Sequence, residues 1–284
     1  MRLHLCFFGI GALSFDGGYM EPNDFQNHIN NNISIDDINP LPLMHNAMST
    51  DYKKITTEGI VPQPCDVHKG QDCAYFYYGR PLHIPKPKPT LQTDDFYVPV
   101  CMGVDPEFVI NGGCYVAPSD TGAYHKKESL IEHFKGIPPE RYALTASLAN
   151  IRSYIKTFWG SNYNYIHGNC TYTVDPIYED VVLVRMLEVL KGTVKFDGID
   201  ERIKAVEIRT ASHCPLIKTA KVMIVPSDLF EDCEKDFPDA MVIPYRATAG
   251  VYDNQMENVE NIEKAFIMYL IDFGFISLSE EQAS

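Results

Sequence analysis

The sequence predicts a mixed α+β fold, with strands toward both ends of the chain and helices between them. Three observations carry this prediction. Short runs of alternating or β-branched apolar residues come early, and such runs return in the last third of the 284 residues. The middle of the chain instead places apolar residues three and four apart, which is the spacing of one helix face. Strands and helices do not alternate along the chain, which argues against a repeating βαβ array.

The N-terminal part is predicted to be one buried strand followed by a polar connection. The segment Leu5–Phe15 is apolar and follows Arg2, but it lacks a clear small-x-small cleavage site, so a strand is preferred to a signal peptide. Residues 23–39 are rich in asparagine and aspartate and predict a loop. We therefore divide the chain into an N-terminal strand with an asparagine-rich extension, residues 1–40, and one domain, residues 41–284.

The domain opens with a histidine between a strand pattern and a helix pattern. Residues 41–45 alternate as on a strand that ends at His45. A short helix is predicted next, capped by Ser49 or Thr50 and ended by Gly59. The N–H groups at the start of such a helix attract phosphate or ribose oxygens, so His45 is a candidate binding residue.

The second candidate segment is rich in aromatic residues and ends in Gly79-Arg80-Pro81. As a strand it would divide its side chains between two faces, with Tyr75, Tyr77 and Gly79 on one and Phe76, Tyr78 and Arg80 on the other. Aromatic residues also favour strands for packing reasons alone, so an ordinary aromatic sheet face is the alternative.

Helices are predicted through the middle of the chain. The expected helices are Ser129–Lys135, Pro139–Trp159 and one capped by Asp175 and ended by Gly192. Residues 79–99 hold five prolines and are expected to be extended rather than helical. Tyr115 and Tyr124 flank the sequence Asp120-Thr121-Gly122, which is either a substrate loop or simply a turn; we favour the turn.

The last third returns to strand patterns. The predicted elements are the strands Ala205–Thr210, Lys221–Pro226 and Ala240–Tyr245 and a closing helix Asn261–Phe273. Within the first strand, alternation puts Glu207 on the same side as Ala205 and Arg209. A carboxylate in the middle of a strand is either a catalytic group or an exposed residue paired with Arg209 or Lys204.

Composition limits the possible functions. The formal net charge of −14 repels phosphate backbones, which argues against broad binding to nucleic acid. Eight irregularly spaced cysteines predict reduced thiols in a cytoplasmic protein rather than a disulfide framework. No stretch approaches the roughly 20 apolar residues of a membrane span, so no membrane partner is expected.

Three segments together resemble the ADP-ribosyltransferases, most closely the DNA-modifying toxins called DarT and, less clearly, the diphtheria-toxin branch. The resemblance rests on His45 before a helix that ends in Gly59-Ile60, on the aromatic strand, and on the strand that carries Glu207. Two positions depart from the family pattern: Ala47 stands where serine or threonine is usual, and Val206 is inserted before the glutamate.

The resemblance implies a split mixed β-sheet and an enzyme that consumes NAD. NAD would be cleaved to nicotinamide, and ADP-ribose would pass to an unknown protein or nucleic-acid acceptor. His45 would hold a ribose, Tyr75 or Tyr78 would stack on nicotinamide, and Arg80 would meet the pyrophosphate. Arg209 is grouped with these cofactor-binding residues, and Glu207 would be the catalytic carboxylate. Such enzymes are commonly toxins or anti-phage effectors.

Other functions remain open at this point. An NAD glycohydrolase would transfer ADP-ribose only to water, and a member of the fold without catalysis would sense a ligand or bind a protein. Zinc binding by Cys65, His68 and Cys73 is less favoured, because their spacing fits no well-known zinc module. A Cys–His nucleophile is the least favoured, since nothing selects one cysteine over another. The expected reaction needs no metal.

Overall fold

The computed structural model describes eight stretches of the chain: residues 25–30, 32–65, 67–82, 98–122, 128–173, 180–194, 201–248 and 254–277. The strand predicted at Leu5–Phe15 lies outside these stretches, as do Asp175, Tyr124 and most of the proline-rich segment. In the described part of the chain, no helix combines the length and the apolar character that crossing a membrane requires.

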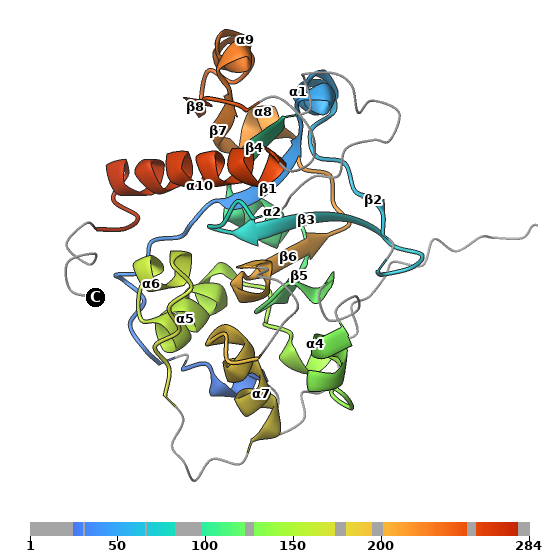
Figure 1. Ribbon diagram of the computed structural model, residues 1–284, viewed down its shortest axis with the longest axis vertical. Helices are drawn as coiled ribbons and strands as arrows, with labels where there is room; N and C mark the ends of the chain where they lie inside the picture. Colours follow the sequence, from blue (N-terminus) through green and yellow to red (C-terminus); the bar gives the residue numbers. More distant parts are fainter. Residues whose placement is uncertain are drawn as a thin grey trace, which may run out of the picture.

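The described strands form one mixed sheet (Figure 1). They are β1 Leu43–Met48, β2 Gln63–Pro64, β3 Asp72–Tyr78, β4 Pro99–Val104, β5 Tyr115–Ala117, β6 Glu207–Thr210, β7 Ala220–Pro226 and β8 Met241–Tyr245. Their order is β5-β6-β3-β1-β4-β7-β8, with β2 paired to β3. The β7–β8 pair is parallel and the other pairs are antiparallel. A mixed α+β fold is thus confirmed.

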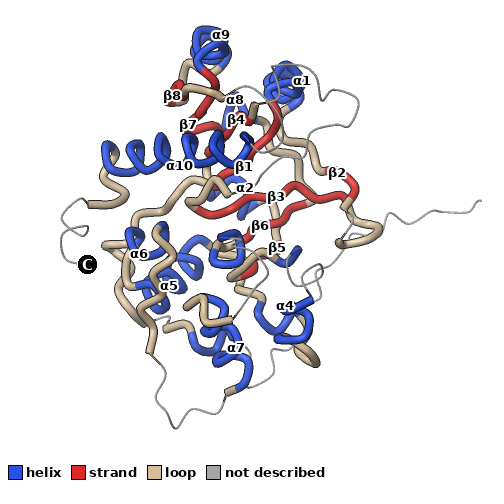
Figure 2. Tube along the Cα trace, viewed as in Figure 1, coloured by secondary structure: helices blue, strands red, loops and turns tan. Residues whose placement is uncertain are grey.

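The described α-helices fall between and after these strands. They are α1 Tyr52–Glu58, α2 Pro106–Asn111, α4 Glu128–His133, α5 Leu148–Trp159, α6 Asn162–Ile166, α7 Val181–Leu190, α8 Leu216–Thr219, α9 Phe230–Asp236 and α10 Asn254–Asp272. Helices α4 to α7 all lie between β5 and β6 in the chain, which agrees with the prediction of helices in its middle. They lie together below the strands in Figure 2, whereas α10 crosses β4, β7 and β8.

Local chemistry explains where the helices begin. The Ser147 hydroxyl accepts a hydrogen bond from the Asn150 N–H at the start of α5. The predicted helix Pro139–Trp159 is wrong in its first part, because Leu144 forms a β-bridge with Val116 of β5 instead of continuing a helix. Only a 3-10 helix, Pro139–Tyr142, precedes that break. Asp180 caps α7 through the N–H groups of two following residues.

Two other sequence predictions are corrected here. The predicted cap of α1 at Ser49 or Thr50 is wrong, since Ser49–Asp51 forms a 3-10 helix and Asp51 holds the cap position. The strand that was expected to end at His45 continues to Met48, because its whole length pairs with β4.

The core is continuous from the N-terminal segment to the closing helix. Phe25 is fully buried and stacks on Phe158 of α5, with ring centroids 4.9 Å apart. Ile38 and Leu41 are also fully buried, so the described part of the asparagine-rich segment packs into the domain. Phe266 brings α10 into the same apolar cluster.

At the centre of the sheet, the pairing between β1 and β3 is short. Strand β1 pairs with β4 along its full length. It pairs with β3 only where Leu43 faces Tyr78 and Met44 faces Tyr77. Beyond Met44 the two strands have no further register pairs, so the β5–β6–β3 part and the β1–β4–β7–β8 part separate there. We call the point where the pairing of β1 with β3 ends the split.

Candidate active site

One face of the β5–β6–β3 part gathers several of the predicted site residues. Glu207 lies opposite Tyr77, and Arg209 lies opposite Tyr75. On the other side of β6, Arg209 lies opposite Tyr115. Directly opposed residues of antiparallel strands point to the same face. The prediction that Glu207 and Arg209 share a face is therefore confirmed, and the tyrosine rings belong to that face too.

Glu207 is buried and tightly held. Its side chain is only 1% exposed. The Thr121 hydroxyl donates to Oε1 at 2.6 Å, and the Thr121 backbone N–H donates to Oε2 at 3.2 Å. The pKa of Glu207 is raised well above its usual 4.5, chiefly by burial and secondly by the negative charge of the nearby Asp120. The hydrogen bonds from Thr121 and the charge of Arg209 act in the opposite direction.

Asp120 belongs to the turn whose role the sequence left open. It is 5% exposed, and its Oδ1 accepts a hydrogen bond from the Gly122 N–H at 2.8 Å. Its Oδ2 lies 3.5 Å from Nε of Arg202, in the 3-10 helix Glu201–Lys204. The preferred reading as a simple turn is not borne out, because a bend at Ser119 leads into helical backbone at Thr121 and Gly122, and the segment lies against Glu207. Sequence reasoning noted this turn without connecting it to the glutamate.

Arg209 is flanked by an aromatic ring and a histidine. Its guanidinium carbon lies 4.5 Å from the centre of the Tyr115 ring, a distance at which a cation and an aromatic face attract. A guanidinium nitrogen of Arg209 contacts Nε2 of His68. This Nε2 is 3.5 Å from the Thr121 hydroxyl. No sequence pattern predicts that His68 lies beside Arg209.

Cys65 completes the rim of this face. Its sulfur lies 2.7 Å from the Tyr75 hydroxyl, and it accepts a hydrogen bond from the His68 N–H. Burial opposes ionisation of the thiol, but these hydrogen bonds lower its pKa overall. Within the described residues, no three His, Cys, Asp or Glu side chains form a group suited to a metal ion. The thiols of the seven described cysteines are free.

His45 lies on the other face of the sheet, at the split. Its ring packs near Phe76, with centroids 5.6 Å apart. Its Nδ1 is 2.8 Å from the carbonyl oxygen of Tyr75; because a carbonyl only accepts, Nδ1 carries the proton. Burial lowers the pKa of His45. The imidazole thus bridges β1 and β3 where their backbone pairing has ended.

Tyr78 and Arg80 do not join Glu207. Tyr78 is fully buried on the opposite face, and its hydroxyl accepts a hydrogen bond from the Leu41 N–H at 3.0 Å. Arg80 is 3% exposed. Gly79 has a positive φ of 61°, and an added Cβ would lie 2.3 Å from the Leu41 side chain. Packing of the chain on itself therefore explains this glycine without a ligand.

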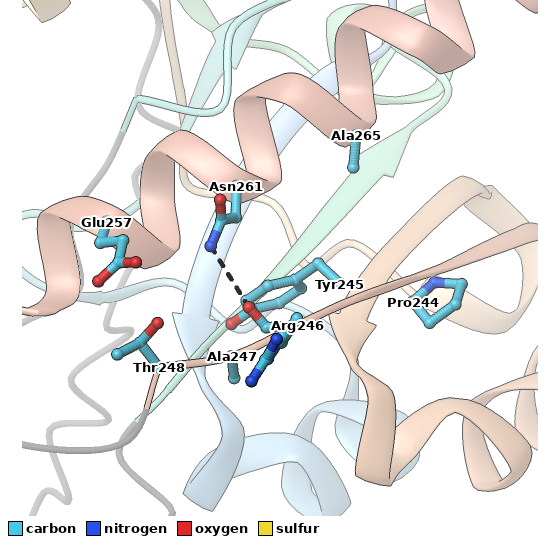
Figure 3. Close-up of a pocket in the computed structure, with 8 residues that line it drawn as sticks. All are labelled: Pro244, Tyr245, Arg246, Ala247, Thr248, Glu257, Asn261 and Ala265. Atoms are coloured by element: carbon cyan, nitrogen blue, oxygen red, sulfur yellow. Dashed lines mark hydrogen bonds between the residues drawn. The ribbon is translucent and has the colours of Figure 1, made fainter.

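Two hollows formed by described residues lie apart from Glu207. One, of about 670 Å³, lies between the end of β8 and α10 and includes Arg246, Glu257 and Asn261 (Figure 3). There the Asn261 side chain donates to the Arg246 carbonyl. The other, of about 630 Å³, is lined by residues that include Gln26 and Asn150. Neither contains a predicted site residue.

Comparisons of the chain with models of protein families, with curated proteins and with solved structures gave no match. Its function is therefore inferred from its own residues. The face that carries Glu207, Arg209 and Tyr75 is the strongest candidate, because buried charged groups are costly unless a function or a network of partners retains them.

Proposed function

We propose that the protein is an NAD-dependent ADP-ribosyltransferase that uses Glu207 as its catalytic carboxylate. The observation that carries the proposal is the buried glutamate on β6, held by Thr121 and lying on one face with Tyr75 and Arg209. The narrow joint between β1 and β3 agrees with the split sheet that the resemblance implies. The acceptor is a protein or a nucleic acid, and the role as a toxin or anti-phage effector follows from the resemblance.

The reaction needs a negative charge close to a developing positive one. The bond between the nicotinamide nitrogen and the ribose carbon breaks, and its electron pair leaves with nicotinamide. A nucleophilic atom of the acceptor bonds to that carbon, and the acceptor's proton passes to Glu207 or to water. The ribose becomes positively charged in the transition state, and a carboxylate in a water-poor site stabilises that charge strongly.

The structure suggests how the other residues would share the work. Tyr75 is preferred to Tyr78 as the ring that meets nicotinamide, because Tyr75 is on the face of Glu207 and Tyr78 is buried on the opposite one. Arg209 would attract a phosphate of NAD. His45 would act at the split, where its bond to the Tyr75 carbonyl fixes the backbone that carries the ring.

The proposal is tested by incubating the purified protein with NAD and following nicotinamide by chromatography. NAD labelled on its adenine then separates the two kinds of turnover. Label that moves to a macromolecule in a cell extract supports a transferase, whereas free labelled ADP-ribose alone supports a glycohydrolase. No release of nicotinamide over the pH range in which Glu207 titrates would reject both.

A second candidate function has its own observations. A non-catalytic member of the fold would bind a ligand or a protein without cleaving NAD. Ala47 at a position where the family has a hydroxyl favours this reading, and so does the near-complete burial of Glu207 and Arg80. Calorimetry that detects NAD binding by a protein that releases no nicotinamide would support it.

A further inference from the structure

We propose that the segment Ser119–Gly122 positions Glu207, with Thr121 orienting the carboxylate through two hydrogen bonds and the buried Asp120 next to Thr121 in the same segment. This inference rests on the proposed function, because it assigns the segment a task in the same site. Thr121 and Asp120 act through Glu207 and are positioning residues rather than catalytic ones.

The contacts of Thr121 fix both oxygens of the carboxylate. One donor is the hydroxyl and the other is the backbone N–H, and each reaches a different oxygen. Two donors from one residue define the plane of the carboxyl group, whereas a single bond would leave it free to rotate. Thr121 is itself 1% exposed, so water does not compete for these bonds.

The charged groups near Glu207 shift its pKa in opposite directions. Asp120 opposes its ionisation from the segment Ser119–Gly122, and Arg209 favours it from β6. Tyr75 and Tyr115 reach the same environment from β3 and β5, since each feels the charge of Glu207. Three further groups contact these neighbours of Glu207. Arg202 pairs with Asp120, His68 contacts Arg209, and Cys65 contacts Tyr75.

These contacts predict opposite effects of two substitutions in one segment. Thr121→Val removes a donor to the carboxylate, so Glu207 should titrate at higher pH. Asp120→Asn keeps nearly the same side-chain shape but removes a negative charge near Glu207, so Glu207 should titrate at lower pH. A general loss of structure would not shift the pKa of Glu207 in opposite directions in the two variants. The sign of each shift therefore tests the proposal.

The experiment follows the side-chain carboxyl signal of Glu207 by NMR in protein labelled with ¹³C at that carbon. The Glu207→Gln variant assigns the signal by its loss. Thr121→Ser, which keeps the hydroxyl, should titrate like the native protein. Thr219→Val is the matched control, because Thr219 is a buried threonine whose hydroxyl donates to the Pro215 carbonyl four residues earlier and not to Glu207. Unchanged titration in both Thr121→Val and Asp120→Asn, or shifts of the same sign, would overturn the proposal.

Kinetics separate this inference from the proposed function. In Thr121→Val, kcat for nicotinamide release should fall roughly 10- to 100-fold, the value of one hydrogen bond to a charged group, and KM should change little. Native kcat in a folded Thr121→Val variant would overturn the inference while the transferase assignment stands. If the native protein releases no nicotinamide although the two titration shifts occur, the positioning stands and the transferase assignment fails.

Discussion

The two parts of the sheet on either side of the split are built differently. In the β1–β4–β7–β8 part, β4 is buried along its whole length and pairs with apolar residues of β7 such as Met223. The β5–β6–β3 part buries Glu207 and, in the segment against it, Asp120 and Thr121. The first part is stabilised by apolar packing, which depends on shape and area. The second depends on each polar group keeping its partner.

This difference indicates which part is the scaffold and which is the site. Buried charged groups lower the stability of a fold unless they are paired and hydrogen-bonded, so their presence at one place is a sign of a functional site. They occur here beside the narrow joint between β1 and β3, where His45 supplies the bridging hydrogen bond. Substitutions of apolar core residues in β4 and β7 should therefore change stability alone, and substitutions around Glu207 should change titration and turnover.

The largest effect on stability is expected from Met102→Ala in β4. Met102 is fully buried, and removing its side chain leaves a cavity, so the free energy of unfolding should fall by about 2–5 kcal/mol. Urea denaturation measures the change. Met241→Ala is the control, because Met241 of β8 is 47% exposed. Equal losses in both variants would contradict the view of β4 as the packed centre.

A smaller effect is expected from His45→Ala at the joint. The loss of one hydrogen bond to the Tyr75 carbonyl should lower the free energy of unfolding by about 0.5–1.5 kcal/mol, with some further loss of packing on Phe76. If NAD binding depends on the joint, KM should rise roughly 2- to 13-fold, which is the same energy expressed as a ratio. Melting temperature and KM are measured on one preparation. A stable variant with native KM but a kcat lower by orders of magnitude would instead make His45 a general base.

Glu207 should make the stability of the protein depend on pH, whereas the apolar residues of β4 and β7 should not. Its pKa in the folded state is raised above 4.5, so the folded protein holds a proton that the unfolded chain has released. The stability from this proton is fully present below pH 4.5 and is lost as pH rises through the folded pKa. Glu207→Gln should therefore melt at a higher temperature than the native protein at pH 7, and the difference should shrink toward pH 4.5. A constant difference across this range would contradict the raised pKa.

The smallest effect is expected from chelation. EDTA should change neither the melting temperature nor the release of nicotinamide, because the proposed reaction uses no metal. A large fall in melting temperature, with stoichiometric zinc in the untreated protein, would favour a structural site at Cys65, His68 and Cys73.

Much of the fold could be predicted from periodicity. The alternation in Ala205–Thr210 placed Glu207 and Arg209 on one face, and the pairing of β6 with β3 confirms it. Alternation also separated Tyr75 from Tyr78. It could not show that Tyr78 would be fully buried, because the burial of each sheet face depends on which elements cover it. The length of β1 was missed for a similar reason, since its pairing with β4 is decided far along the chain.

The polar network could not be predicted from the sequence. Thr121 and Glu207 are 86 residues apart, and the helices α4 to α7 lie between them. The contact of Arg209 with His68 spans 141 residues. No local pattern reports such contacts, because they depend on how the sheet brings β5, β6 and the segment after β5 together.

The central claim is that Glu207 performs chemistry on NAD, and its most direct test is nicotinamide release by Glu207→Gln. Gln keeps the shape of the side chain and removes the charge. Glu107→Gln in α2 is the matched control, because Glu107 is exposed and distant from β6 in the chain. We predict that Glu207→Gln remains folded, still binds NAD and releases no nicotinamide, while Glu107→Gln has native activity. Release at the native rate by folded Glu207→Gln would contradict the assignment.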